Sequence, residues 1–186
     1  MPVNEIFRDS EARMKKTIEY LSHELSRIRT GRATPALLDV VKVEYYGSTV
    51  PINQVSTITA PEPRLLVVQP WEKRLIGEIE KAILQSDLGL NPSNDGTVVR
   101  VPIPELSEER RRDLLKLIKK FCEESRIAIR NIRRDANEAI KKLEKDHAVS
   151  EDESHKMQDK IQKLTDEYVK QVDERYEMKE TEILEN

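Results

Sequence analysis

The chain has 186 residues, of which 36% are charged and 37% are hydrophobic, and its formal net charge is −3. This length allows one compact domain or two small ones. The single cysteine, Cys122, excludes an internal disulfide framework and fits a reducing compartment. No apolar run approaches the roughly 20 residues of a membrane-spanning helix, and the amino terminus resembles neither a secretory signal nor a transit sequence. We therefore expect a cytoplasmic protein without a membrane segment.

Glycine and proline divide the chain into three parts. All five glycines and eight of the nine prolines lie within residues 31–104. Because these two residues are the strongest breakers of regular elements, the sequence predicts a helix, then a turn-rich insert, then further helices. We expect residues 1–30 and 105–186 to form one domain, and residues 31–104 to form an inserted domain.

The first part has the pattern of an amphipathic helix over about residues 3–29. Phe7, Met14, Leu21 and Ile28 recur every seven residues, and other apolar residues fill the alternate turns. This spacing places the apolar side chains on one face of a helix.

The last part predicts two more helices. The first of them runs from about Ser107 to Lys145, and a short break follows it. Ser150 and Glu153 then form a capping box, which opens the third helix. Three helices with apolar faces and no other partner predict a bundle, and the short connection makes the last two antiparallel. The inner face of the third helix should carry Met157, Ile161, Leu164, Tyr168, Val172 and Ile183.

The insert alternates and turns like a small sheet. Several short strands and one helix in roughly 75 residues predict a small α+β domain. Trp71 follows Pro70 at a strand-to-helix turn, and we expect it in the core. The expected elements are a hairpin of 41–45 and 50–52, a strand pair of 55–59 and 65–69, a helix over 73–86 and a strand over 97–101.

Two chain segments join the insert to the helices. Thr30 and Gly31 belong to the first segment, and Pro102, Pro104 and Glu105 belong to the second. Gly31 supplies a soft torsion, whereas each proline fixes its own φ angle. This arrangement predicts a hinge between the two domains and an L-shaped molecule.

One side of the second long helix is rich in positive charge. Residues 108–145 carry a formal charge of +5 and residues 146–186 carry −7, so the overall value hides a basic helix beside an acidic one. At about 100° of rotation per residue, one sector of this helix, here called the cationic face, contains Arg112, Lys116, Lys119, Arg126, Arg130, Arg133, Arg134, Asn137 and Lys141. The opposite side should carry Leu114, Ile118, Phe121, Ala128, Ile132, Ala136, Ala139 and Leu143.

The cationic face predicts binding to a polyanion, most plausibly the phosphates of folded RNA. A merely solvated helix face would show alternating charges, but Glu123 is the one acid in this sector. The face also lacks aromatic residues on which bases could stack, since Phe121 belongs to the apolar side. Recognition should therefore depend on phosphates and RNA shape.

The sequence offers no support for catalysis. It contains no glycine-rich phosphate loop and no cysteine–histidine metal spacing, and its three histidines have no paired ligand nearby. We expect no catalytic residue, no cofactor and no metal site.

Several long motifs occur in a fixed order along the whole chain: Ser26-Arg27-Ile28-Arg29-Thr30-Gly31-Arg32-Ala33, Leu37-Leu38-Asp39, Val43-Glu44-Tyr45-Tyr46-Gly47, Ser86-Asp87-Leu88-Gly89-Leu90-Asn91-Pro92, Arg100-Val101-Pro102-Ile103-Pro104, Leu106-Ser107-Glu108-Glu109-Arg110-Arg111 and Ala128-Ile129-Arg130-Asn131-Ile132-Arg133-Arg134-Asp135-Ala136-Asn137. In these motifs the chain resembles the ribosome recycling factor family. The resemblance implies a long antiparallel three-helix bundle with an inserted β/α/β domain, shaped like a tRNA.

The resemblance also implies a function. Members of the family act on the post-termination ribosome with elongation factor G and GTP, and they separate the subunits without hydrolysing anything themselves. Their bundle lies on large-subunit ribosomal RNA, and their insert and hinge contact elongation factor G. Carried onto this chain, the RNA-binding residues are Arg29, Arg32, Arg110, Arg130, Arg133, Arg134 and Asn137. The residue pattern alone adds Arg126 and Lys141 to this set.

The alternative to a recycling factor is a helical RNA-binding adaptor or chaperone without recycling activity. Such a protein could use the same helices with charges that only solvate them, and charge reversal on the cationic face would not change its binding. In either case we expect a monomer, which binds the ribosome if it is a recycling factor and another RNA if it is an adaptor.

Overall fold

The computed structural model describes residues 2–185 and divides into two compact units. Unit 1 comprises the segment that ends at Arg29 together with Glu109–Glu185, and unit 2 comprises Thr30–Glu108. Each unit contains its own cluster of buried apolar side chains.

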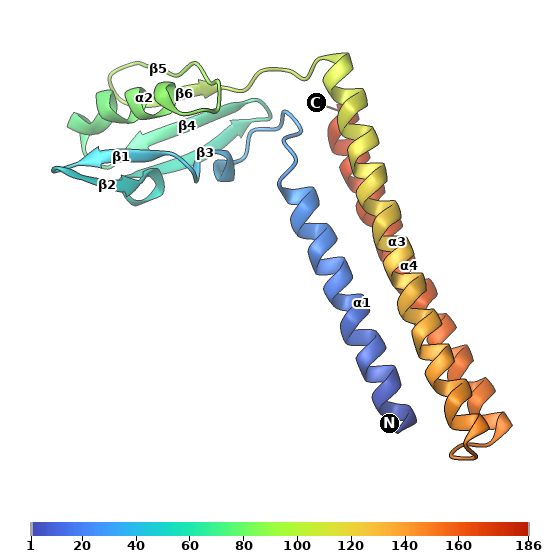
Figure 1. Ribbon diagram of the computed structural model, residues 1–186. Coiled ribbons are helices and arrows are strands. Elements are labelled where there is room, and N and C mark those ends of the chain that lie inside the picture. Colours follow the sequence, from blue (N-terminus) through green and yellow to red (C-terminus); the bar gives the residue numbers. More distant parts are fainter. Residues whose placement is uncertain (1, 186) are drawn as a thin grey trace. The chain divides into compact units, whose positions relative to one another are not determined.

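Unit 1 is a bundle of three long helices, as the periodicity predicts. They are α1 (Val3–Ser26), α3 (Glu108–Lys145) and α4 (Glu151–Glu185). Within this unit α3 runs antiparallel to both α1 and α4 (Figure 1). α1 ends earlier than predicted, because the Ile28 N–H donates to the Leu25 carbonyl at 3.2 Å and begins a tighter turn.

Residues spaced three or four apart along α3 fill the core of the bundle. This spacing keeps them on one side of the helix, where they meet apolar side chains of α1 and α4. Toward the α3–α4 connection, one cluster joins Ile6 of α1 to Met157 and Ile161 of α4. The buried residues of α3 are Leu114, Ile118, Cys122, Ser125, Ile129, Ile132, Ala136 and Ile140.

The α3–α4 connection has the predicted capping box. His147 takes a left-handed conformation with φ of 58°, which turns the chain out of α3. The Glu153 N–H donates to Ser150 Oγ at 3.1 Å, and the Ser150 N–H donates to Glu153 Oε2 at 3.0 Å. This reciprocal pair satisfies two backbone donors at the start of α4.

Unit 2 is built from a hairpin, a four-stranded antiparallel sheet and one helix. The hairpin strands β1 (Lys42–Tyr45) and β2 (Ser48–Pro51) turn at Tyr46 and Gly47, which both have positive φ. The sheet has the order β3-β4-β6-β5. Its strands and the helix are β3 (Ser56–Glu62), β4 (Leu65–Pro70), β5 (Ser93–Asn94), β6 (Val99–Pro102) and α2 (Ile76–Gln85).

The segments predicted to form a hinge are largely fastened to unit 2. Pro102 is the last residue of β6 and pairs with Leu65, so it belongs to the sheet as well as to the predicted connection. The next residue, Ile103, is buried in the core of unit 2, and its N–H donates to the Arg64 carbonyl at 2.8 Å. Glu105 forms an ion pair with Arg64. The pairing of β4 with β6 continues to Pro102 because a proline at the end of a strand, which has no N–H group, need not donate a hydrogen bond to the neighbouring strand.

Trp71 is exposed, which contradicts the prediction that it is buried. Its side chain is 63% exposed, and its indole Nε1 donates to Thr57 Oγ1 at 2.9 Å. Strand side chains alternate between two faces. Leu66 and Val68 of β4 point into the core, so Trp71 continues the opposite face.

Gly31 is a position that should not tolerate a side chain. Its φ is +79°, and a Cβ atom there would lie 3.2 Å from Leu106 Cγ. The left-handed conformation alone costs a residue with a side chain about 1–2 kcal/mol. We expect Gly31→Ala to lower the free energy of unfolding of unit 2 by at least that amount. Native-state amide exchange in β4 and β6 measures this quantity directly.

Gly77→Ala is the matched control for this substitution. Gly77 lies in α2, and a Cβ atom there would meet nothing within 4 Å. Alanine at a helical position should stabilise the unit by roughly 0.5–1 kcal/mol. Equal effects of the two substitutions would contradict the conformational argument for Gly31.

Candidate RNA interface

The cationic face of α3 is not directly opposite the core. Cys122, Ser125, Ile129 and Ile140 are buried, whereas Phe121, Ala128, Ala139 and Leu143 are only half-buried. At about 100° per residue, the core side is therefore rotated by roughly 40° from the predicted direction. The reason is that α3 packs against two helices, and small residues such as Cys122 and Ser125 fit closest to them. One edge of the cationic face is consequently turned toward α4.

Arg126 lies on this edge and holds α4. Its side chain is only 19% exposed, and its Nη2 lies 2.7 Å from Asp173 Oδ1. Its Nη1 also donates to Glu123 Oε2 at 3.2 Å. Burial lowers the pKa of Arg126, but the hydrogen bond to Asp173 and the charge of that carboxylate raise it above its ordinary value. The guanidinium is thus used within the bundle, and the structure does not present it with the outward-facing cations.

Arg133 also contacts α4, and Asn137 lies one turn further along α3. Arg133 is half-buried, and its Nη1 donates to Gln162 Oε1 at 3.3 Å. Because Gln162 is neutral, the charge of Arg133 is not cancelled by this contact. Asn137 is half-buried as well, and among the described residues no donor reaches its buried Oδ1 atom.

The outward part of the face contains cations that are available to a ligand. Arg130 is 47% exposed and has one loose ion pair, with its Nη1 3.7 Å from Glu123 Oε1. Arg134 and Lys141 are exposed, and neither has an ion pair among residues 2–185. Separations of four and seven residues place these three side chains on one side of the helix. Lys116 and Lys119 extend the row toward the start of α3.

The other predicted RNA-binding residues do not share this face. Arg110 is exposed on α3, but its position is about 120° around the helix from Arg134. Arg29 follows the end of α1 in unit 1, and Arg32 belongs to unit 2. All three side chains are exposed.

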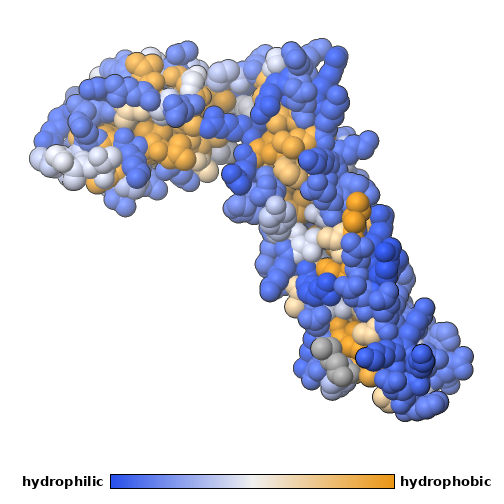
Figure 2. All heavy atoms as spheres, viewed as in Figure 1, coloured by the Kyte–Doolittle hydropathy of each residue, from blue (hydrophilic) through white to orange (hydrophobic). Residues whose placement is uncertain are grey.

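Sequence reasoning missed an apolar residue in the middle of the outward surface. Ile127 is 49% exposed and lies between the turns that carry Glu123 and Arg130. A count of charges cannot detect an exposed apolar residue. The signal that could have identified Ile127 is its position around the helix, which is far from the apolar side of α3. On the face of the helices that Figure 2 shows, hydrophilic residues line the edges and hydrophobic residues are visible along the middle.

The described residues show no sign of a metal centre or a membrane segment. Within residues 2–185, no three His, Cys, Asp or Glu side chains are grouped so that they could hold a metal ion. None of the helices in the same range is both long and apolar enough to span a bilayer.

Known proteins resemble the whole chain. A family model described as ribosome recycling factor matches residues 21–184. Ribosome-recycling factor of Symbiobacterium thermophilum is 61% identical over 181 residues, which cover 97% of this chain and 98% of that protein. Ribosome-recycling factor of Carboxydothermus hydrogenoformans is 57% identical over 182 residues, or 98% of each chain.

Solved structures agree with these relatives. A solution structure of the ribosome recycling factor superposes with a TM-score of 0.74 at 44% identity, covering 100% of this chain and 99% of the other. A second match has a TM-score of 0.64 at 51% identity, covering 99% of this chain and 100% of the other. It is described as models for the T. thermophilus ribosome recycling factor and the E. coli elongation factor G bound to the E. coli post-termination complex. By sequence and by fold, this chain belongs to the ribosome recycling factor family.

Proposed function

We propose that this protein recycles ribosomes. It binds the post-termination ribosome and, with elongation factor G and GTP, promotes its separation into subunits for a new round of translation. Membership of the family supports this function, as does the matched structure described with elongation factor G on a post-termination complex. A factor with these partners works in the cytoplasm, where it encounters ribosomes, and it acts as a monomer.

The outward cations of α3 are the single observation that carries the binding step. Arg130, Arg134 and Lys141 lie along one helix of 38 residues that is anchored in a core by its buried side. A rigid helix presents its charges at fixed spacing, so they can meet successive phosphates without first being ordered. No Phe, Tyr or Trp belongs to this outward sector, so contacts to the RNA backbone explain binding better than stacking on bases does.

The remaining predicted residues have different roles in this proposal. Arg133 can add a phosphate contact at the edge of the face, since its partner Gln162 is neutral. Arg29, Arg32 and Arg110 contact ribosomal RNA outside the face. Arg126 and Asn137 act within the α3–α4 contact and support the helix that carries the phosphate contacts.

Elongation factor G supplies the chemical step in this proposal. GTP hydrolysis belongs to that partner, and this protein transmits the resulting movement without a catalytic group of its own. Unit 2 and its connections to α1 and α3 receive the partner. The separate cores of the two units support a division of work in which unit 1 binds RNA and unit 2 is displaced.

A subunit-splitting experiment tests the function. Post-termination ribosomes are mixed with this protein, elongation factor G and GTP, and light scattering follows their dissociation. We expect splitting only when all three components are present. Splitting that proceeds without elongation factor G, or no splitting with all three, would contradict the proposal.

A further inference from the structure

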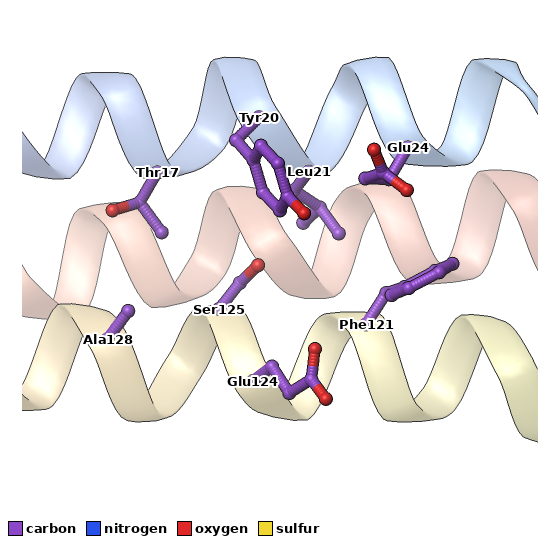
Figure 3. Close-up of a pocket in the computed structure, with 8 residues that line it drawn as sticks. All are labelled: Thr17, Tyr20, Leu21, Glu24, Phe121, Glu124, Ser125 and Ala128. Atoms are coloured by element: carbon purple, nitrogen blue, oxygen red, sulfur yellow. The ribbon is translucent and has the colours of Figure 1, made fainter.

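A groove of about 230 Å³ lies between α1 and α3, away from the outward cations (Figure 3). Its walls are mainly apolar. Leu21 and the ring of Tyr20 come from α1, and Phe121 and Ala128 come from α3. Tyr20 is 65% exposed, yet Figure 3 shows its ring reaching from α1 toward α3. The groove therefore has aromatic and aliphatic surfaces that remain accessible in the folded bundle.

A hydroxyl group without a protein partner faces this groove. Ser125 is only 6% exposed, and its Oγ forms no hydrogen bond with any of the described residues. Other buried hydroxyls of unit 1 bond to the preceding helical turn, as Ser10 does to the Ile6 carbonyl and Thr165 to the Ile161 carbonyl, both at 2.8 Å. The Ser125 hydroxyl instead lies in the space between α1 and α3 (Figure 3). Ser125 Oγ is not among the unpaired polar atoms that are fully shielded from solvent, so it is open to the groove and can form a hydrogen bond with a ligand there.

The rim of the groove is negatively charged. Glu24 of α1 and Glu124 of α3 line it, and no described lining residue is basic. Glu24 is 19% exposed, and its nearest cation is Arg27 at 3.7 Å. Glu124 is exposed and has no ion pair within residues 2–185. A carboxylate rim above aromatic walls favours a cation, since both ring faces and carboxylates attract positive charge.

We propose that this groove binds a small organic cation. An ammonium group lies between Glu24 and Glu124 and donates to Ser125 Oγ, and an apolar body of about ten non-hydrogen atoms packs between Tyr20 and Phe121. The occupant is a free small molecule, because a volume of about 230 Å³ cannot hold a helix, which is roughly 10 Å across. This site is independent of the RNA-binding function proposed above.

Phenethylammonium is a suitable probe for the full-length protein. Titration is followed by amide chemical shifts, and 2-phenylethanol and phenylacetate serve as neutral and anionic probes of the same shape. We expect shifts confined to residues 17–24 and 121–128, with a Kd on the order of 1 mM for a ligand of this size. The neutral probe should bind about tenfold more weakly, and the anion should not bind measurably.

Two substitutions separate the site from a general charge effect. Glu124→Gln should weaken phenethylammonium binding about five- to tenfold, whereas Glu138→Gln, on the same helix outside the groove, should leave it unchanged. Ala128→Leu should fill the groove and abolish binding. Equal affinity for all three probes, or shifts scattered over the molecule, would overturn the proposal. A lysine-containing tripeptide that bound tenfold more tightly than phenethylammonium would also overturn it, because the occupant would then be the side chain of a partner protein.

Discussion

The double substitution Arg130→Glu, Arg134→Glu should reduce binding to the large ribosomal subunit by roughly 100-fold or more at moderate salt. Both side chains are exposed and lie on one side of α3, and Arg134 has no ion pair among the described residues. Each substitution removes one phosphate contact and places a carboxylate near a phosphate. Sedimentation of the protein with ribosomal subunits measures the loss.

A matched variant distinguishes a local contact from net charge. Lys163 and Lys170 are exposed on α4, and Lys163→Glu, Lys170→Glu changes the net charge by the same amount. This variant should retain most of the binding, because both lysines belong to the acidic helix α4 and not to the outward cations of α3. If both double variants lost binding equally, a specific RNA-binding face on α3 would be excluded.

Removal of unit 2 should separate binding from recycling. A variant in which a glycine linker joins Arg29 to Glu109 retains all three helices of the bundle apart from Glu108. Its core and its ion pairs remain, including the contacts of Arg13 with Asp135 and of Arg126 with Asp173. We expect a folded helical protein that binds ribosomes within about tenfold of the full chain and splits none of them.

Circular dichroism, subunit sedimentation and the splitting experiment examine this variant in turn. A variant that unfolds would show that the bundle needs unit 2 for its stability. A folded variant that still splits ribosomes would show that elongation factor G does not act through unit 2.

The sequence predicts the helices of unit 1 well because the signals there are local. A long chain segment without glycine or proline, with apolar residues at helical spacing, can bury its apolar side only as a helix against other helices. The Ser150–Glu153 capping box is equally local, since both of its hydrogen bonds lie within four residues. The hairpin of β1 and β2 is predicted for the same reason, and its turn lies at Tyr46 and Gly47.

The differences between the sequence predictions and the structure concern properties that depend on distant contacts. Arg126 shares a sector with Arg130 in the sequence pattern. Its guanidinium nevertheless donates to Asp173, which lies 47 positions further along the chain. The direction of the α3 core depends on two partner helices whose positions no single-helix pattern contains. Trp71 was assigned to the core by residue type, although its position in the alternation of β4 places it on the exposed face.

Among the residues of the cationic face, the structure separates exposed cations from a cation that is held within the bundle. Arg134 is exposed without an ion pair within residues 2–185, whereas Arg126 is largely buried against α4. Loss of Arg126 should cost about 1 kcal/mol of bundle stability, because its partner Asp173 is half-exposed. The two arginines therefore form a natural pair for comparison.

The salt dependence of ribosome binding tests the central claim most directly. Affinity for the large subunit is measured between about 50 and 200 mM salt for the unmodified chain, for Arg134→Ala and for Arg126→Ala. The account predicts that Arg134→Ala lowers the slope of log affinity against log salt by about one unit, with unchanged thermal stability. Arg126→Ala should lower thermal stability and leave the slope unchanged. An unchanged slope for Arg134→Ala would contradict the assignment of the outward surface of α3 to RNA phosphates.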